Sequence, residues 1–212
     1  MIRIIRASKM TKLVLKKILK VFLTLQWAKE LPRQGFIALG FKRNEADSVA
    51  AHSWTTAMLT YMLGQQMVKN LPVGRQDGQK LDLNKAIKMA LFHDMAETIV
   101  GDVGTFVKGM AKGAFAGVEE EGLKWLVKDL PTATEITSLV NEYTQRKTPE
   151  ARLVKLADNL DALAQAKGVP AAQSALKYFK EVYHITKIPF HKTAVEMILK
   201  DEVEPERGWQ KK

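Results

Sequence analysis

The sequence predicts an all-α protein, in which one helical bundle forms a single domain over residues 1–212. Apolar residues recur at helical spacing along most of the chain, and no stretch of useful length shows the alternation of a half-buried strand. Hydrophobic residues make up 46% and charged residues 26%, a globular balance that allows a sizeable core. The core is expected over residues 10–180, with a basic N-terminal helix at 10–30 and a C-terminal helix and tail at 185–212.

The individual helices follow from the positions of prolines, glycines and capping residues. The first helix stops before Pro32, and the stretch up to Asp47 is interpreted as a loop with turns at Gly35 and Gly40. Asp47 or Ser48 caps the next helix. The helices expected after this loop cover residues 48–71, 83–100, 118–130, 132–146, 149–167, 171–181 and 190–201, with a second loop at 72–82 whose last residue, Asp82, caps the helix that follows.

The helix at 48–71 is expected to carry His52 on its inward face. The inward stripe predicted from the 3.6-residue period contains His52, Thr55, Leu59, Met62 and Gln66. Trp54 and the methionines are expected to fill gaps in the core; these methionines stand at positions 58, 62, 67, 89 and 95.

The charge and cysteine content narrow the possible chemistry. Cysteine is absent, which excludes disulfides, thiolate metal sites and cysteine nucleophiles. The formal net charge is +10, and no acidic residue precedes Glu30. We interpret the basic N-terminal stretch as a solvated first helix; the alternatives are an arm for nucleic acid or an anionic membrane, and a transit peptide.

The first helix is apolar but too interrupted to cross a bilayer. Lys16, Lys17 and Lys20 break its apolar run, so no transmembrane segment is expected. In the absence of a secretory signal the expected compartment is the cytoplasm. Met10 offers an alternative start site, which would place residues 1–9 outside the protein.

The helix at 83–100 carries polar residues that are costly to bury. His93 and Asp94 interrupt an otherwise apolar helix, Glu97 follows one turn later, and Asp102 stands just past the end. A buried carboxylate without a partner would take up a proton. A divalent cation removes this cost, because imidazole nitrogen and carboxylate oxygen are both good ligands. Glu97 lies on the same face as His93, close enough to act on water without binding the metal.

Two further helices offer the missing ligands. His52 is the inward histidine described above, and the helix at 149–167 places Asp158 and Asp161 beside its core stripe. One of these two acids can complete a site of two histidines and two aspartates. The other is expected to orient a ligand or to pair with a lysine.

The order His52, then His93-Asp94, then Asp158 resembles the H…HD…D pattern of the HD-domain phosphohydrolases, and among them the 5′-deoxynucleotidases. The matching segments are PRQGF, EADSVAAHSW, ALFHDMAETIVGDV and VKLADNLDALAQA, spread over residues 32–167. The resemblance implies an all-helical bundle of the HD type, a single divalent metal ion held by His52, His93, Asp94 and Asp158, and catalytic roles for Glu97 and Asp102.

The resemblance also implies contacts with the substrate. Arg33 matches an arginine near the phosphate, and Phe36 stands where the family has a tryptophan that packs on the deoxyribose. The segment DVGTFVK, Asp102 to Lys108, is similar to the family's D-x-P-T-P-x-K, with Gly104 and Phe106 in place of the prolines. This match makes Thr105 and Lys108 phosphate contacts.

The expected activity is therefore metal-dependent hydrolysis of (deoxy)nucleoside 5′-monophosphates to nucleoside and phosphate. The alternatives are an HD phosphohydrolase for a ribonucleotide, a cyclic nucleotide or an alarmone, and a helical protein that binds nucleic acid through the basic N-terminus. Nucleic-acid binding is disfavoured because the arm lacks interleaved aromatic residues.

The types of the predicted metal ligands suit Mn, Co, Fe, Ni or Zn. A homo-oligomer, a dimer or larger, is expected, with the apolar first helix as its interface.

Two other segments carry weaker expectations. The glycine-dense stretch at 101–117 is interpreted either as a lid over the site or as an irregular surface loop. Glu119 to Glu121 are expected in the first turn of a helix, where the helix dipole favours acids.

Overall fold

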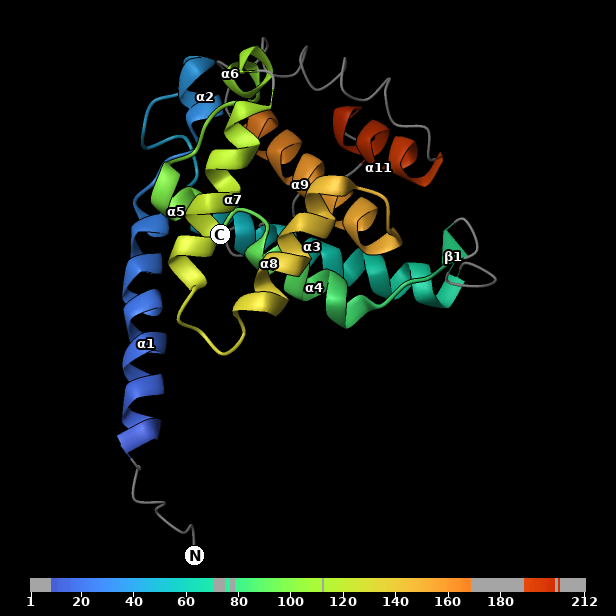
Figure 1. The fold of residues 1–212 in the computed structure, drawn as a ribbon. Coiled ribbons are helices and arrows are strands. Elements are labelled where there is room, and N and C mark those ends of the chain that lie inside the picture. The colour runs from blue at the N-terminus through green and yellow to red at the C-terminus, as the bar shows by residue number, and fades with distance from the viewer. Residues whose placement is uncertain are drawn as a thin grey trace, which may run out of the picture.

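The protein is built almost wholly from helices, as the computed structural model shows (Figure 1). The structure describes residues 9–70, 75–76, 79–111, 113–168, 189–200 and 202. The predicted all-α class is confirmed. In the described part of the chain the departures are a minimal antiparallel pair, β1 (Arg75–Gln76) and β2 (Gln79–Lys80), inside a segment expected as a loop, and an isolated antiparallel bridge between Pro32 and Ser48.

The helices occupy most of the predicted ranges. Their bounds are α1 (Lys9–Leu25), the 3₁₀ helix η1 (Gln26–Lys29), α2 (Gln34–Ala38), α3 (Val49–Asn70), α4 (Leu83–Phe92), α5 (Glu97–Val100), α6 (Thr105–Met110), α7 (Ala114–Val127), α8 (Ala133–Gln145), α9 (Pro149–Gly168) and α11 (Pro189–Leu199). The helix predicted at 171–181 lies outside the described residues.

The predicted caps are present at two helix starts. The Ser48 hydroxyl accepts a hydrogen bond from the backbone N–H of Ala51 at 3.2 Å, so Ser48 caps α3. The Asp82 carboxylate accepts from the N–H of Lys85 at 3.0 Å and caps α4. Both contacts satisfy N–H groups that a helix leaves without an internal partner.

Three boundaries differ from the prediction. The helix expected at 83–100 is interrupted after Phe92, because the N–H groups of Met95 and Glu97 bond carbonyls three residues back instead of four. The loop expected at 32–47 contains the short helix α2. Helix α7 begins at Ala114 rather than at 118, so Glu119 to Glu121 lie beyond its first turn.

Helices α3, α4, α8 and α9 enclose the main core. Met89, Leu153 and Val154 have no exposed surface there, and Tyr143 of α8 packs in the same cluster. Helix α3 approaches closely at Gly64, where an added Cβ would lie 2.3 Å from the Leu83 side chain. This packing brings the inner faces of α3, α4 and α9 together.

The inward face of α3 differs from the predicted stripe. His52, Thr56 and Thr60 are fully buried, while Met62 of the predicted stripe is exposed. Trp54 and Met58, expected in the core, are exposed as well; Met67, Met89 and Met95 are buried as predicted. The buried side of α3 therefore carries threonines, and several of its large apolar residues face outward.

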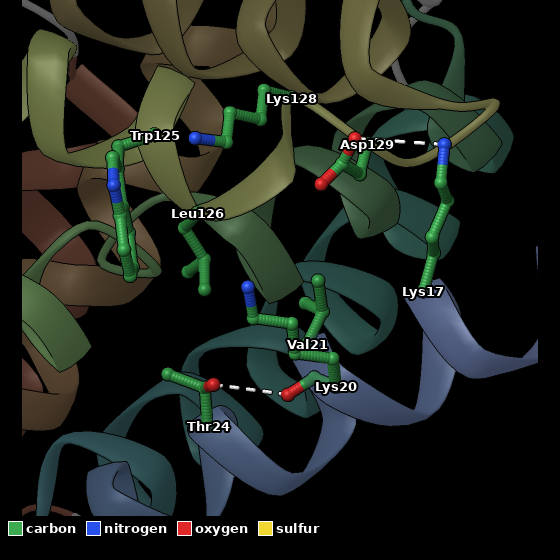
Figure 2. A pocket seen from close by; sticks show the side chains of 8 residues that line it. All are labelled: Lys17, Lys20, Val21, Thr24, Trp125, Leu126, Lys128 and Asp129. Carbon is green, nitrogen blue, oxygen red and sulfur yellow. Dashed lines mark hydrogen bonds and ion pairs between the residues drawn. The ribbon is translucent and has the colours of Figure 1, made fainter.

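Helix α1 attaches to the bundle mainly through its C-terminal half. Val21 is buried against the Leu126 side of α7. Figure 2 shows the shallow pocket between the two helices, where Lys17 pairs with Asp129 at 3.5 Å and Lys20 lies over the Trp125 ring. Over the described ranges, none of the helices combines the length and the apolar character that crossing a membrane requires.

Candidate metal centre and active site

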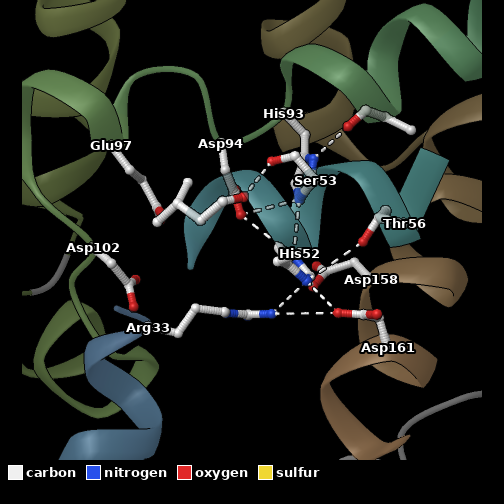
Figure 3. Close-up of polar contacts among 12 residues, drawn as sticks. Arg33, His52, Ser53, Thr56, His93, Asp94, Glu97, Asp102, Asp158 and Asp161 are labelled. Atoms are coloured by element: carbon white, nitrogen blue, oxygen red, sulfur yellow. Dashed lines mark hydrogen bonds and ion pairs between the residues drawn. The ribbon is translucent and has the colours of Figure 1, made fainter. Parts of the chain in front are cut away.

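The four predicted metal ligands converge where α3, α4 and α9 meet (Figure 3). The Nε2 atom of His52 lies 3.3 Å from Nε2 of His93, 3.3 Å from Oδ1 of Asp158 and 3.5 Å from Oδ2 of Asp94. The Nε2 atom of His93 lies 3.1 Å from the same Asp94 oxygen. Both imidazoles are buried, and the Asp94 side chain is partly open to solvent.

The hydrogen bonds of the two rings direct their lone pairs into this cluster. The Nδ1–H of His93 donates to the carbonyl of Ala90 at 2.8 Å, and the Nδ1–H of His52 donates to Oδ2 of Asp161 at 2.6 Å. Because a carbonyl and a carboxylate can only accept, these two contacts favour the tautomer with the proton on Nδ1. Two Nε2 lone pairs and two carboxylate oxygens then face one another, an arrangement that repels unless a cation lies between them.

The spacing of these atoms suits a transition metal. A cation with bonds of about 2.0–2.2 Å to nitrogen and oxygen holds its ligand atoms roughly 3.0–3.5 Å apart. The separations of 3.1 to 3.5 Å fall in this range. His52, His93 and Asp94 thus form a candidate metal site, and Asp158 faces it from α9.

Protonation of His52 is the alternative to cation binding. Burial lowers the pKa of His52, but its hydrogen bonds to Asp158 and Asp161 outweigh burial and raise the pKa to about 9. The same neighbours therefore attract either a proton or a metal ion. For Asp94, burial raises the pKa, but the charges of His93 and His52 outweigh it and keep the pKa well below the usual range.

Asp161 contacts the predicted ligand His52 and pairs with an arginine and not with a lysine. It lies 2.6 Å from Nδ1 of His52 and 4.0 Å from Nη1 of Arg33, contacts that suit the expected role of orienting His52. Arg33 Nη1 also lies against Nδ1 of His52. The guanidinium is mostly buried beside the ligands, where the resemblance expects a phosphate contact.

Phe36 lies behind Arg33 and not on an open surface. Its ring is 4% exposed and packs with Phe41 against Ala162 and Ala166 of α9. The Arg33 guanidinium carbon stands 5.6 Å from the ring centroid, a cation–π distance. The predicted contact of Phe36 with substrate stays a prediction, and the structure gives the ring a different role as support for Arg33.

Glu97 starts α5 at the edge of the cluster and is buried. Burial raises its pKa, and the nearby charges of Asp94 and Asp102 raise it further, to about 9, against the opposing effect of Lys108. These effects favour the protonated form of Glu97 in the metal-free protein. A carboxylic acid of this kind can donate a proton in a reaction.

Asp102 connects the segment after α5 to the segment that carries Arg33. Its Oδ2 accepts the backbone N–H of Gln34 at 2.5 Å. A Cβ added to Gly104 would lie 3.3 Å from the Cα of Gly35, a tighter contact than a Cβ usually makes, so the approach favours glycine. Gly104, which stands where the D-x-P-T-P-x-K pattern has its first proline, thus lies at a contact between the two segments.

Lys108 contacts two carboxylates. Its Nζ lies 3.4 Å from Oε1 of Glu97 and 2.6 Å from Oε1 of Glu119. The expectation that Glu119 serves the first turn of a helix is wrong, because α7 starts five residues earlier. The side chain of Thr105 lies outside what the structure describes, so its predicted phosphate contact stays a prediction.

Sequence reasoning missed two residues that touch Asp158. The hydroxyl of Tyr143 donates to Oδ2 of Asp158 at 2.7 Å, and Lys155 Nζ donates to the same oxygen at 2.6 Å. Lys155 stands at i−3 from Asp158, a spacing that could have indicated the pair. Tyr143 lies fifteen residues earlier on another helix, and no sequence signal pointed to it.

The comparisons with known proteins agree with this geometry. The sequence model of the HD domain matches residues 26–198. The chain belongs to the HD domain family. Its HD-domain relatives include the 5′-deoxynucleotidase HDDC2 of Dictyostelium discoideum, 34% identical over 140 residues, which cover 65% of this chain and 70% of that protein. The 5′-deoxynucleotidase HDDC2 of Mus musculus is 29% identical over 183 residues, 85% of this chain and 83% of its own.

A solved structure with the same architecture confirms the fold. The PH0347 protein from Pyrococcus horikoshii OT3 superimposes with a TM-score of 0.66 at 30% identity, over 86% of this chain and 96% of that one. The predicted resemblance and the predicted enzyme class, a hydrolase with a phosphohydrolase domain, are therefore confirmed.

Proposed function

We propose that this HD-domain protein is a metal-dependent 5′-deoxynucleotidase, which hydrolyses deoxynucleoside 5′-monophosphates to nucleoside and phosphate. The observation that carries the proposal is the cluster of His52, His93, Asp94 and Asp158 with buried Glu97 at its edge. The names of the HDDC2 relatives support the substrate class.

The residues around the cluster suit phosphate-ester hydrolysis. A divalent cation, when bound, supplies Lewis acidity toward water and toward the phosphate. Arg33 presents a fixed guanidinium fork, which matches phosphate oxygens better than a lysine can. As the bond from water oxygen to phosphorus forms, the bond from phosphorus to the 5′-oxygen breaks, and Glu97 donates its proton to that leaving oxygen. The proton that the attacking water gives up then returns to the Glu97 carboxylate.

Asp102 and Lys108 support these two groups. Asp102 fixes the backbone next to Arg33 through Gln34. Lys108 stays charged, because its ion pair with Glu119 outweighs burial and raises its pKa. Its charge lies beside Glu97, where it can stabilise negative charge as the acid gives up its proton.

The test of the proposed activity is phosphate release from metal-stripped protein. Mn, Co, Mg or Zn is added back singly, and deoxyribonucleoside and ribonucleoside 5′-monophosphates are offered in parallel. We expect metal-dependent release that favours the deoxy substrates. Equal rates with ribonucleotides would show that the enzyme does not prefer deoxyribose. No release from any monophosphate would contradict the proposed activity and leave other nucleotides as substrates.

Arg33→Lys is expected to raise KM for the monophosphate by at least about tenfold, because the ammonium group cannot make two parallel bonds to phosphate. The metal content should stay at the wild-type level, since Arg33 is not a metal ligand. Steady-state kinetics and metal analysis measure both quantities. Arg43→Lys, an exposed arginine on the loop before α3, is the matched control, and an equal KM effect there would contradict the assignment.

We also propose that the chain forms a homo-oligomer through α1. Leu15, Leu19, Phe22 and Leu23 of this helix are all at least 46% exposed, an apolar surface unusual for a monomer. Light scattering should give a mass that is a multiple of 23.8 kDa, and Phe22→Glu should reduce it to the monomer. Dissociation by Trp54→Glu and not by Phe22→Glu would move the interface to the outer face of α3.

A further inference from the structure

We infer that Tyr143 of α8 is a positioning residue that fixes the orientation of Asp158 for metal binding. This inference rests on the proposed metal centre. Tyr143 lies outside the four segments that resemble the HD phosphohydrolases, and its helix carries none of the predicted site residues. Figure 3 shows Asp158 on the α9 side of the cluster, and α8 packs against α4 and α9 there.

The first argument is how the two oxygens of Asp158 are used. Oδ1 lies 3.3 Å from Nε2 of His52 and faces the metal site. Oδ2 receives the hydroxyl of Tyr143 at 2.7 Å and the ammonium of Lys155 at 2.6 Å. A carboxylate oxygen has two lone pairs, and both on Oδ2 are occupied. The carboxylate therefore cannot rotate to exchange its oxygens without breaking two hydrogen bonds.

The second argument is that Tyr143 is the rigid member of this pair of donors. Tyr143 is 9% exposed and packs in the core, whereas the Lys155 side chain is partly open to solvent on a flexible stem. An unpaired hydroxyl at such a depth would cost free energy, so the phenol and Asp158 hold one another.

The third argument is that Tyr143 also touches a second ligand. Its ring meets the imidazole of His93 edge-on, with centroids 5.1 Å apart. One side chain on α8 thus contacts ligands from both α4 and α9. Groups that hold metal ligands in place commonly change metal affinity by about 10- to 100-fold when they are removed.

The experiment compares Tyr143→Phe with the wild type by calorimetric titration of metal-stripped protein with Mn²⁺ alone. Phenylalanine keeps the ring against His93 and removes only the hydroxyl. We expect the dissociation constant to rise about 10- to 100-fold. Tyr61→Phe, on the exposed face of α3, is the matched control and should leave the constant unchanged.

A double-mutant cycle separates positioning from a general structural effect. In an Asp158→Asn background, Tyr143→Phe should change Mn²⁺ affinity by less than about twofold, because the residue acts through Asp158. Equal weakening in both backgrounds, or no weakening in either, would overturn the inference. If Asp94→Asn and the wild type bind Mn²⁺ equally, the metal centre itself is wrong, and that outcome is distinct from a failure of Tyr143 alone.

Discussion

Asp94→Asn is expected to lower kcat/KM for phosphate release by at least about 10³-fold, because the cation stabilises the transition state by several kcal/mol. Oδ2 of Asp94 lies 3.1 Å from Nε2 of His93 and 3.5 Å from Nε2 of His52, so it is the carboxylate that both imidazoles share. Asparagine preserves the volume and removes the charge. Kinetics at saturating metal and metal analysis of the purified protein measure the effect.

The control for this substitution is Asp129→Asn. Asp129 follows α7, is about half exposed and pairs with Lys17 of α1, and it belongs to none of the segments that carry the predicted ligands. The control should keep the wild-type rate and metal content. An Asp94→Asn protein that binds metal and turns over normally would show that Asp94 is not a ligand, and the proposed centre would fail.

Glu97→Gln is expected to lower kcat by about 10²- to 10⁴-fold, the range for loss of a general acid or base. Glutamine retains the shape and the contact with Lys108 but has no proton to give. Metal affinity should remain within about threefold of the wild type, because the proposed role of Glu97 is that of a general acid and not of a metal ligand. A full loss of metal in this variant would instead make Glu97 a ligand.

The same substitution is expected to stabilise the metal-free protein at alkaline pH. The pKa of Glu97 rises from 4.5 in the unfolded chain to about 9 in the folded protein. Between these values the unfolded state has lost the proton that the folded state keeps, so the free energy of unfolding contributed by Glu97 falls as the pH rises. A glutamine at this position does not titrate and has no such cost, so the gain in thermal stability should be larger at pH 8 than at pH 5.

Thermal unfolding of the metal-stripped wild type and Glu97→Gln at pH 5 and pH 8 measures this difference. Glu120→Gln, on a half-exposed side chain that pairs with Lys124, is the control and should show no gain at pH 8. A destabilised Glu97→Gln protein at pH 8 would show that the folded state holds Glu97 ionised, and Glu97 would then act as a base in the reaction.

Several elements were predictable because their signals are local. Helix α9 lies within one residue of its predicted range, and the side chains of Ser48 and Asp82 cap α3 and α4. Caps and helix-breaking residues act over one turn, so the sequence reveals them directly. The outward turn of Trp54 was not predictable, because α3 is apolar around most of its circumference and the period does not select one face.

The interruption of the helix after Phe92 could not be predicted from the sequence either. Met95, Ala96 and Ile99 continue the apolar pattern, so periodicity predicts one helix through residue 100. The chain tightens there while the His93 ring bonds the carbonyl of Ala90. That local change aims His93, Asp94 and Glu97 at one centre (Figure 3).

The sequence by itself determined the helical class and the resemblance to the HD pattern, and through that resemblance it predicted the set of two histidines and two aspartates. It could do so because polar ligands inside apolar helices need a compensating partner wherever the helices pack. Only the tertiary structure showed that the Phe36 ring packs beside Arg33, that Glu119 pairs with Lys108, and that Tyr143 and Asp161 contact the predicted ligands Asp158 and His52. Except for Arg33 and Phe36, these pairings join residues on different helices, so their partners are set by how the helices pack and not by spacing along the chain.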